Sequence, residues 1–111
     1  MISSDTIERL LQAYREAGRE HANAAGDLIR VAEFQKVTLA ELMREHIVED
    51  KSAARAEISA RADRRYMEII EAHAEAKKEE RKSAYLLNEA QMRIDLIRTN
   101  EASRRTELAK T

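Results

Sequence analysis

Residues 7–42 read IERLLQAYREAGREHANAAGDLIRVAEFQKVTLAEL, and the spacing of their apolar and small side chains decides the fold. A stripe recurs at alternating steps of four and three, through Ile7, Leu11, Tyr14, Gly18, His21, Ala25, Leu28, Ala32, Gln35, Leu39 and Leu42. This seven-residue repeat is typical of helices that pack along one another as a coiled coil. We therefore predict a long helical arm at residues 1–46.

The N-terminal end of this arm has the residues of a helix start. Ser3, Ser4 and Asp5 precede the stripe, and Glu8 follows Asp5 by three positions, as in a capped helix. Gly18 lies on the stripe and Gly26 beside it, and each glycine costs about 1 kcal/mol relative to Ala inside a helix. We predict a bend at one of them, or the close approach of another backbone at Gly18.

The run HIVEDKS at 46–52 breaks the pattern, so we place a hairpin turn there, followed by a short helix through Ser59 within residues 47–62. Asp50 or Ser52 is suited to cap that helix. Asp63 is a further cap candidate, at the start of a long helix over residues 63–111. Its stripe comprises Tyr66, Ile69, His73, Ala76, Glu80, Ser83, Leu87, Ala90, Ile94, Ile97, Glu101 and Leu108.

A helix from 63 to 109 would be roughly 70 Å long at 1.5 Å per residue, so it cannot bury itself. Its middle, AEAKKEERKSA, is nearly all charged, whereas both ends of its stripe are apolar. The helix therefore needs the N-terminal arm, a second subunit or another partner along its length.

Composition supports an all-α fold, either a long helical hairpin or an elongated coiled coil that associates with itself. The chain has two glycines, no proline and only 4% aromatic residues, so it lacks both the turn residues of a sheet protein and the heavy side chains that stabilise a small globule. The densest apolar stretch is VAEFQKVTLAELM at 31–43. We assign self-association to Leu28, Phe34, Leu39, Leu42, Ile69, Leu87 and Ile94.

The residues that catalysis requires are missing, so we predict that the chain is not an enzyme and holds no cofactor or metal. Cysteine is absent, and none of the three histidines follows a glutamate by three positions, as helical di-iron sites require. Zinc-protease, phosphate-loop and nucleophile-elbow motifs are also absent from the sequence. His46 with Glu49 and Asp50 is explained either as a loose metal site or, in our preferred interpretation, as a solvated turn.

No apolar run approaches the ~20 residues that cross a bilayer, and the N-terminus lacks the features of a signal peptide. We therefore expect a cytoplasmic protein that does not enter a membrane.

Charge is distributed unevenly along the chain. Residues 1–50 hold six Lys/Arg and ten Asp/Glu, which gives −4, whereas residues 51–111 hold fourteen and eleven, which gives +3. Two antiparallel arms that attract each other would explain this, and so would a basic face for nucleic acid. Glutamates interleaved with every basic cluster favour the first explanation.

Basic residues recur along the long helix, and the strongest candidates to contact nucleic acid or an acidic partner are Lys77, Lys78, Arg81, Lys82, Arg98, Arg104 and Arg105. Such a ladder would track phosphates without reading sequence, because no aromatic stacking platform accompanies it. For the central cluster our preferred interpretation is a solvated face paired with Glu71 and Glu75. Around Arg98, Arg104 and Arg105, Glu101 and Glu107 supply only part of the neutralising charge.

Three stretches resemble a group of small helical proteins encoded by bacteriophages and prophages, often near recombination or DNA-replication genes. They are KVTLAELM at 36–43, the Ala/Ser stretch leading to Tyr66 with Ala72 and Ala76 behind it, and IDLIRTNEASRRTEL at 94–108. The resemblance covers roughly residues 31–108, and Arg98 with Arg104 and Arg105 is its most distinctive part. It implies a phage accessory protein in DNA metabolism and supplies no catalytic residue.

We therefore expect a binding or scaffolding factor that acts through protein–protein interaction in DNA metabolism or against host machinery. Two alternatives remain: a non-specific DNA-binding accessory of a recombination module, and a structural coiled-coil subunit of a virion or filament.

Overall fold

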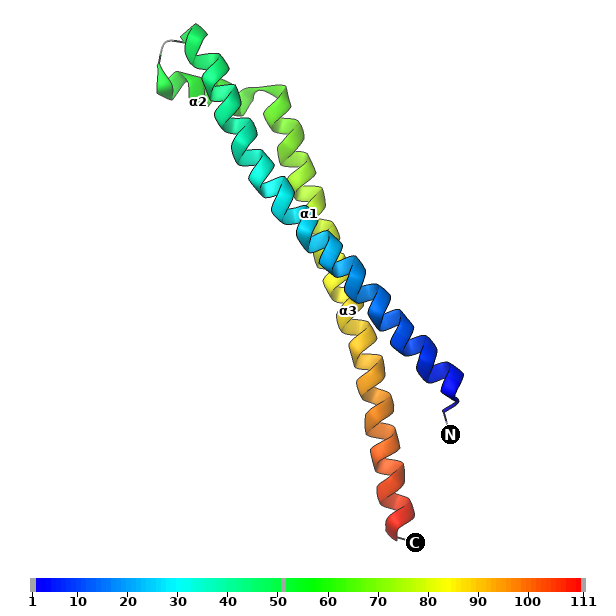
Figure 1. The fold of residues 1–111 in the computed structure, drawn as a ribbon. Helices are drawn as coiled ribbons and strands as arrows, with labels where there is room; N and C mark the ends of the chain where they lie inside the picture. The colour runs from blue at the N-terminus through cyan, green and yellow to red at the C-terminus, as the bar shows by residue number, and fades with distance from the viewer. Residues whose placement is uncertain (1, 51, 111) are drawn as a thin grey trace. The chain divides into compact units, whose positions relative to one another are not determined.

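The fold is an all-α helical hairpin, as predicted. The structure is a computed structural model that describes residues 2–50 and 52–110. It contains α1 (Ser4–Asp50), the short α2 (Ala53–Ala62) and α3 (Arg64–Lys110), with no strand in the described part of the chain (Figure 1). α1 and α3 are 47 residues long and α2 is 10. The chain divides into two compact units, and each is described by itself below.

α1 begins where the sequence indicates, although the capping side chain is that of Ser3. Its Oγ accepts a hydrogen bond of 3.1 Å from the backbone N–H of Thr6, which satisfies one of the free donors of the first helical turn. The helix then runs unbroken through Gly18 and Gly26. A Cβ added at Gly18 would lie 4.0 Å from Leu87 Cδ1, an ordinary contact with a side chain. Neither expected role of Gly18, a bend or a close backbone approach, is therefore needed here.

Gly18→Ala is expected to stabilise the protein by about 1 kcal/mol, because alanine restricts the unfolded chain and has space at this site. Urea unfolding followed by circular dichroism measures the change. Gly26→Ala is a matched variant, since its Cβ would meet only the flexible Arg30 guanidinium, at 3.6 Å. A loss of stability in Gly18→Ala would show that the helices approach more closely than the contact distance indicates.

The predicted turn at 46–52 begins too early, because α1 continues through His46 to Asp50. Ile47 and Val48 are exposed, so the apolar pattern ends there while the backbone hydrogen bonds of the helix continue. The next helix begins at Ala53, and Lys51, within the predicted turn, lies outside the described residues. The end of the apolar pattern in α1 therefore did not mark the end of the helix, which continues for several residues with an exposed apolar face.

α2 confirms the predicted cap at Ser52 and extends three residues beyond the predicted end at Ser59. Ser52 has extended backbone angles, and its side chain accepts a hydrogen bond from the N–H of Arg55 at 3.4 Å. Ala56 and Ala60, one helical turn apart, are fully buried. Their small side chains allow α2 to pack closely onto its neighbours.

The first unit, Asn23–Glu80, is called the hairpin unit here and contains the core of the fold. Leu42, Ala60 and Tyr66 form a buried cluster that joins α1, α2 and α3, and Leu39, Met43 and Ile69 pack against it. Leu42 is only 2% exposed. The predicted stripes of both long helices therefore meet each other in this unit, with α2 closing its end.

The second unit, Met1–Ala22 with Arg81–Thr111, is called the terminal unit. Ile94 and Ser83 are buried at predicted stripe positions of α3, and the described ends of α1 and α3 diverge from each other (Figure 1). Ile7, Tyr14 and Leu108 also belong to the predicted stripes but are exposed. The stripes therefore describe the interhelical packing well in the interior of this unit and less well near the chain ends.

Candidate functional site

Asp63, between α2 and α3, is the hub of a polar cluster in the hairpin unit. Its Oδ1 accepts a hydrogen bond of 2.9 Å from the backbone N–H of Arg65, which caps α3 as predicted, and its Oδ2 lies 3.0 Å from the Arg65 guanidinium. His46 Nε2 of α1 lies 3.1 Å from Asp63 Oδ2. Arg65 also pairs with Glu45 of α1 at 2.7 Å. The cluster therefore ties the α2–α3 junction to α1.

The Arg65 side chain, the Arg65 backbone N–H and His46 together hold the pKa of the Asp63 carboxyl well below its usual range. In the same cluster Asp63 and then Glu45 raise the pKa of Arg65 above its ordinary value. His46 thus has a structural partner 17 residues along the chain, in place of the solvated turn expected for it.

Asp63→Asn is expected to lower the midpoint of urea unfolding at neutral pH. The neutral amide of asparagine cannot form the ion pair that the Asp63 carboxylate makes with Arg65, and it weakens the hydrogen bond to His46. Since folding lowers the pKa of Asp63, its stabilising effect is present above its unfolded pKa of about 4 and is lost as pH falls towards the folded value. The difference between the wild type and the variant should therefore shrink below about pH 4. Denaturation curves at several pH values test this, with the exposed Glu79→Gln as control. A difference that does not depend on pH would mean that the ionised carboxylate is not the stabilising group.

A second polar group lies along the predicted stripes, where α1 faces α3. Gln35 Nε2 donates to the Tyr66 hydroxyl at 3.3 Å, and Gln35 Oε1 lies 2.6 Å from His73 Nδ1. Because a carbonyl oxygen only accepts, Nδ1 of His73 carries the proton. In the terminal unit His21 Nδ1 lies 3.0 Å from Ser83 Oγ. The histidines of the chain therefore all have side-chain partners within the fold.

Metal and membrane sites were sought over residues 2–50 and 52–110. No group of three or more His, Cys, Asp or Glu in this range is placed to hold a metal ion. No helix over the same residues combines the length and apolarity needed to cross a membrane.

The residues predicted to mediate self-association mostly pack within one chain. Leu42 and Ile94 are buried, and Leu39 and Ile69 pack against the core cluster. Leu87 is partly buried, and its Cδ1 would lie 4.0 Å from a Cβ added at Gly18. Leu28 is partly buried. Phe34 differs, because it is 59% exposed and lines a shallow groove of the hairpin unit with Glu41, Leu42, Arg65 and Ile69 among others. Of this set, Phe34 remains the most available to a second molecule.

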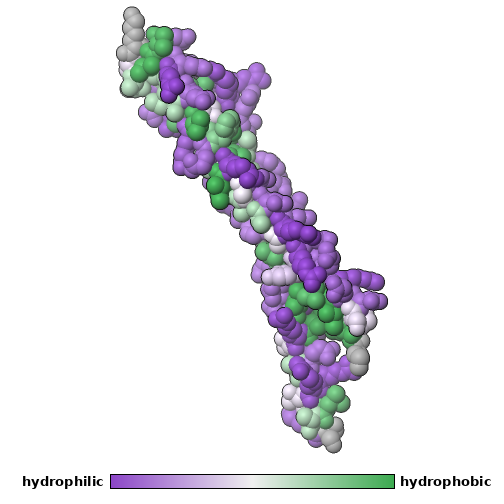
Figure 2. All heavy atoms as spheres, in the orientation of Figure 1, coloured by the Kyte–Doolittle hydropathy of each residue, from purple (hydrophilic) through white to green (hydrophobic). Residues whose placement is uncertain are grey.

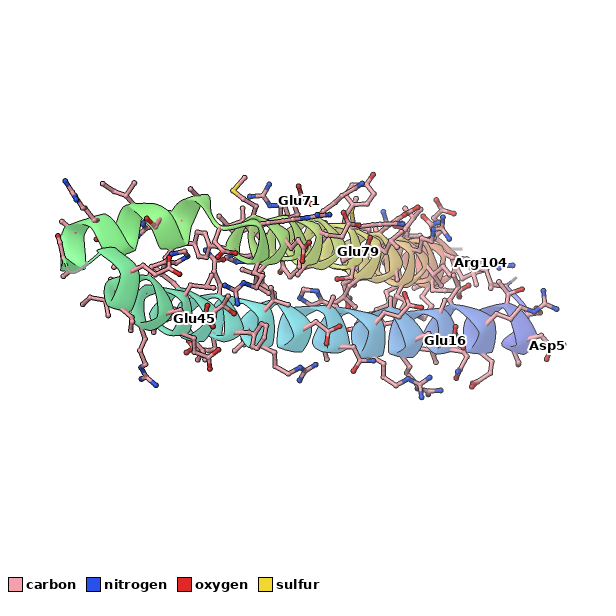
Figure 3. The ribbon with its side chains drawn as sticks, turned by 90° about the horizontal axis from the view of Figure 1, so that it is seen from above. Asp5, Glu16, Glu45, Glu71, Glu79 and Arg104 are labelled. Atoms are coloured by element: carbon pink, nitrogen blue, oxygen red, sulfur yellow. The ribbon has the colours of Figure 1, made fainter. Side chains whose placement is uncertain are left out.

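The predicted basic contacts are all exposed side chains of α3: Lys77 and Lys78 in the hairpin unit, and Arg81, Lys82, Arg98, Arg104 and Arg105 in the terminal unit. Arg104 lies near the C-terminal end of α3 (Figure 3). Over the described residues none of the seven has a carboxylate within 4.0 Å, whereas Arg61, Arg64, Arg65 and Arg93 are paired. The expected neutralisation of Lys78 by Glu75 is likewise not formed, so these cations are available to a partner.

The terminal unit contains an apolar groove with a volume of about 330 Å³, which we call the terminal groove. Its lining residues are Ile7, Leu10 and Leu11 of α1 and Ile94, Ile97, Arg98, Glu101 and Arg105 of α3. Figure 2 shows apolar side chains gathered at the surface of the terminal unit. The groove forms because the two stripes diverge before their apolar residues end, which leaves Ile7 41% exposed.

Sequence reasoning missed this groove, although four of its apolar residues were predicted as stripe positions. The clue was Leu10, an extra apolar residue beside Leu11 that widens the stripe at one end. It also missed Tyr85, Met92 and Leu96, which are 62–70% exposed. They are spaced by seven and four residues, so they lie on one face of α3. The helical periodicity that identified the buried stripe would also have identified this second, exposed apolar stripe.

A scan of the chain against protein-family models found no match. Searches of curated proteins and of solved structures found none either.

Proposed function

We propose that this chain is a non-enzymatic helical binding protein, a phage accessory factor that acts in the bacterial cytoplasm through protein–protein interaction in DNA metabolism or against host machinery. The terminal groove is the observation that carries the proposal, because both long helices expose apolar side chains there on a folded surface. The phage context is supported by the resemblance of residues 31–108 alone.

Burial of apolar surface is the main source of affinity in most protein associations, at about 25 cal/mol per Å². Ile7, Leu10 and Leu11 face Ile94 and Ile97 across the groove, and a partner side chain inserted between them would cover the apolar surface that is still exposed there, most of all that of Ile7. Binding of this kind is expected to tolerate salt, since it does not depend mainly on screened charges.

The test is recovery of partners on the tagged full-length chain from extracts of infected or lysogenic bacteria. The wild type is expected to retain a defined set of proteins that Ile7→Asp loses, whereas Met92→Asp, which places the same charge on an exposed apolar residue outside the groove, retains it. Circular dichroism should be the same for all three proteins. Equal recovery by Ile7→Asp would contradict a role for the groove.

A second candidate function, sequence-independent DNA binding, is favoured by Arg98, Arg104 and Arg105, which have no carboxylate within 4.0 Å among residues 2–50 and 52–110. It predicts that affinity for a single-stranded oligonucleotide falls by orders of magnitude between about 50 and 200 mM salt, and that each phosphate contact removed by Arg→Gln lowers the salt slope by about 0.7 for single strands. Fluorescence anisotropy measures both quantities. Salt-independent binding, or an unchanged slope in the triple variant, would rule out this function.

A further inference from the structure

Two arginines on one flank of the terminal groove indicate which partner it accepts. Arg98 and Arg105 both line the groove and are exposed. They lie seven residues apart, which is two turns on the same face of α3 and about 10 Å along its axis. Neither guanidinium has a carboxylate within 4.0 Å in the part of the chain that the structure describes.

We propose that the terminal groove binds an amphipathic helix of another protein, which carries carboxylates seven residues apart and apolar side chains between them. This inference rests on the proposed function and deepens it by naming the chemistry of the partner. The bound helix would lie along α1 and α3 as a third helix, with its apolar side chains inserted between Ile7 and Ile97.

The size of the groove and its charge agree with this occupant. A cavity of about 150 Å³ accepts benzene, so a groove of about 330 Å³ has room for two side chains of Leu or Phe size. Apolar side chains at positions three, four and seven apart are the usual anchors of a helix in a groove. The fork of an arginine matches a carboxylate in two parallel hydrogen bonds, and two forks two turns apart match carboxylates at positions i and i+7.

A nucleic acid fits the same groove poorly. Its phosphate backbone would gain nothing from the apolar floor that Ile7, Leu10 and Leu11 form with Ile97. A second copy of the chain is also less suited. Within a single helix, its carboxylates seven apart are Glu20 with Asp27 and Glu68 with Glu75, and neighbouring apolar residues such as Leu28 and Ile69 are already partly buried in the chain's own packing.

The experiment measures binding of a fluorescent peptide to the full-length protein by anisotropy. The peptide is a designed amphipathic helix of about four turns, with Leu anchors and Glu at positions i and i+7 of its flank. A second peptide carries Lys in place of both Glu residues, and a third carries Gln in place of the Leu anchors. The wild type should bind the Glu peptide about tenfold or more tightly than the Lys peptide, and should not bind the Gln peptide.

Arg98→Glu/Arg105→Glu should reverse the preference between the Glu and Lys peptides. Lys77→Glu/Lys78→Glu, which changes the net charge equally outside the groove, should leave the preference unchanged. Both substitutions lie on exposed positions, so circular dichroism should match the wild type.

Equal binding of the Glu and Lys peptides would overturn the inference, and so would binding of the Gln peptide. A stable dimer in sedimentation that Ile7→Asp dissociates would also overturn it, because a second copy would then be the occupant. An oligonucleotide that competes with the Glu peptide would do the same in favour of nucleic acid. If no peptide binds but the tagged wild type still recovers proteins that Ile7→Asp does not, the inferred chemistry of the partner is wrong and the proposed function stands. If the extract experiment fails as well, both fail.

Discussion

Leu42→Ala is expected to lower the free energy of unfolding by about 2–5 kcal/mol, the range for large-to-small changes in a packed core. Leu42 is 2% exposed and joins α1 to Ala60 of α2 and Tyr66 of α3. Its loss would leave a cavity at the point where all three helices of the hairpin unit meet. Since small domains are stable by only about 5–15 kcal/mol, this single change would remove a large part of the total.

Urea unfolding followed by circular dichroism measures the effect, and Leu96→Ala is the matched control because Leu96 is 62% exposed. The control is expected to change stability by no more than about 0.5 kcal/mol. If the two variants were equally stable, Leu42 would not lie in a packed core, and the arrangement of the hairpin unit would be wrong.

Ala60→Leu is expected to destabilise the protein by about 1–3 kcal/mol, because extra methyl groups in a full core force neighbouring side chains or the backbone to move. Ala60 has no exposed surface, and it contacts the cluster of Leu42 and Tyr66. Leucine and alanine are both good helix formers, so the change tests packing and leaves the helical propensity of α2 nearly unaltered.

The matched control is Ala54→Leu, an exposed position of the same helix. It should leave the midpoint of thermal unfolding almost unchanged, whereas Ala60→Leu should lower it by several degrees, at about 4–8 °C per kcal/mol for a domain of this size. Equal midpoints would show that α2 packs loosely on the two long helices. A folded but shifted α2 would instead appear as a change in the ring resonances of Tyr66 in NMR spectra.

The stripe positions and two of the caps were predictable from the residues. Leu42, Tyr66 and Ile94 were named from spacing alone and are buried in the structure. Ser52 and Asp63 were named as caps, and each accepts a backbone hydrogen bond at the start of its helix. These predictions succeed because they depend on interactions between residues a few positions apart.

Other features were not predictable in this way. Alanine is common on both buried and exposed helix faces, so Ala56 and Ala60 gave no sign that they are the contact surface of α2. The pairing of Arg65 with Glu45, 20 residues away, and of His46 with Asp63 requires the direction of the chain after Asp50. The two arginines of the terminal groove were named, but their position beside an apolar floor was not.

The sequence by itself determined that the chain forms long helices, which side chains turn inward in the interior of each helix, and that Ser52 and Asp63 are suited to cap α2 and α3, because helix periodicity and capping are local properties. Only the tertiary structure decided that the inward faces of α1 and α3 pack against each other within one chain, and where their divergence leaves a groove. The physical reason is that a seven-residue apolar stripe is buried equally well by any helix of matching period. Which helix buries it depends on contacts between residues far apart in the sequence, such as those of Leu42 with Ala60 and Tyr66.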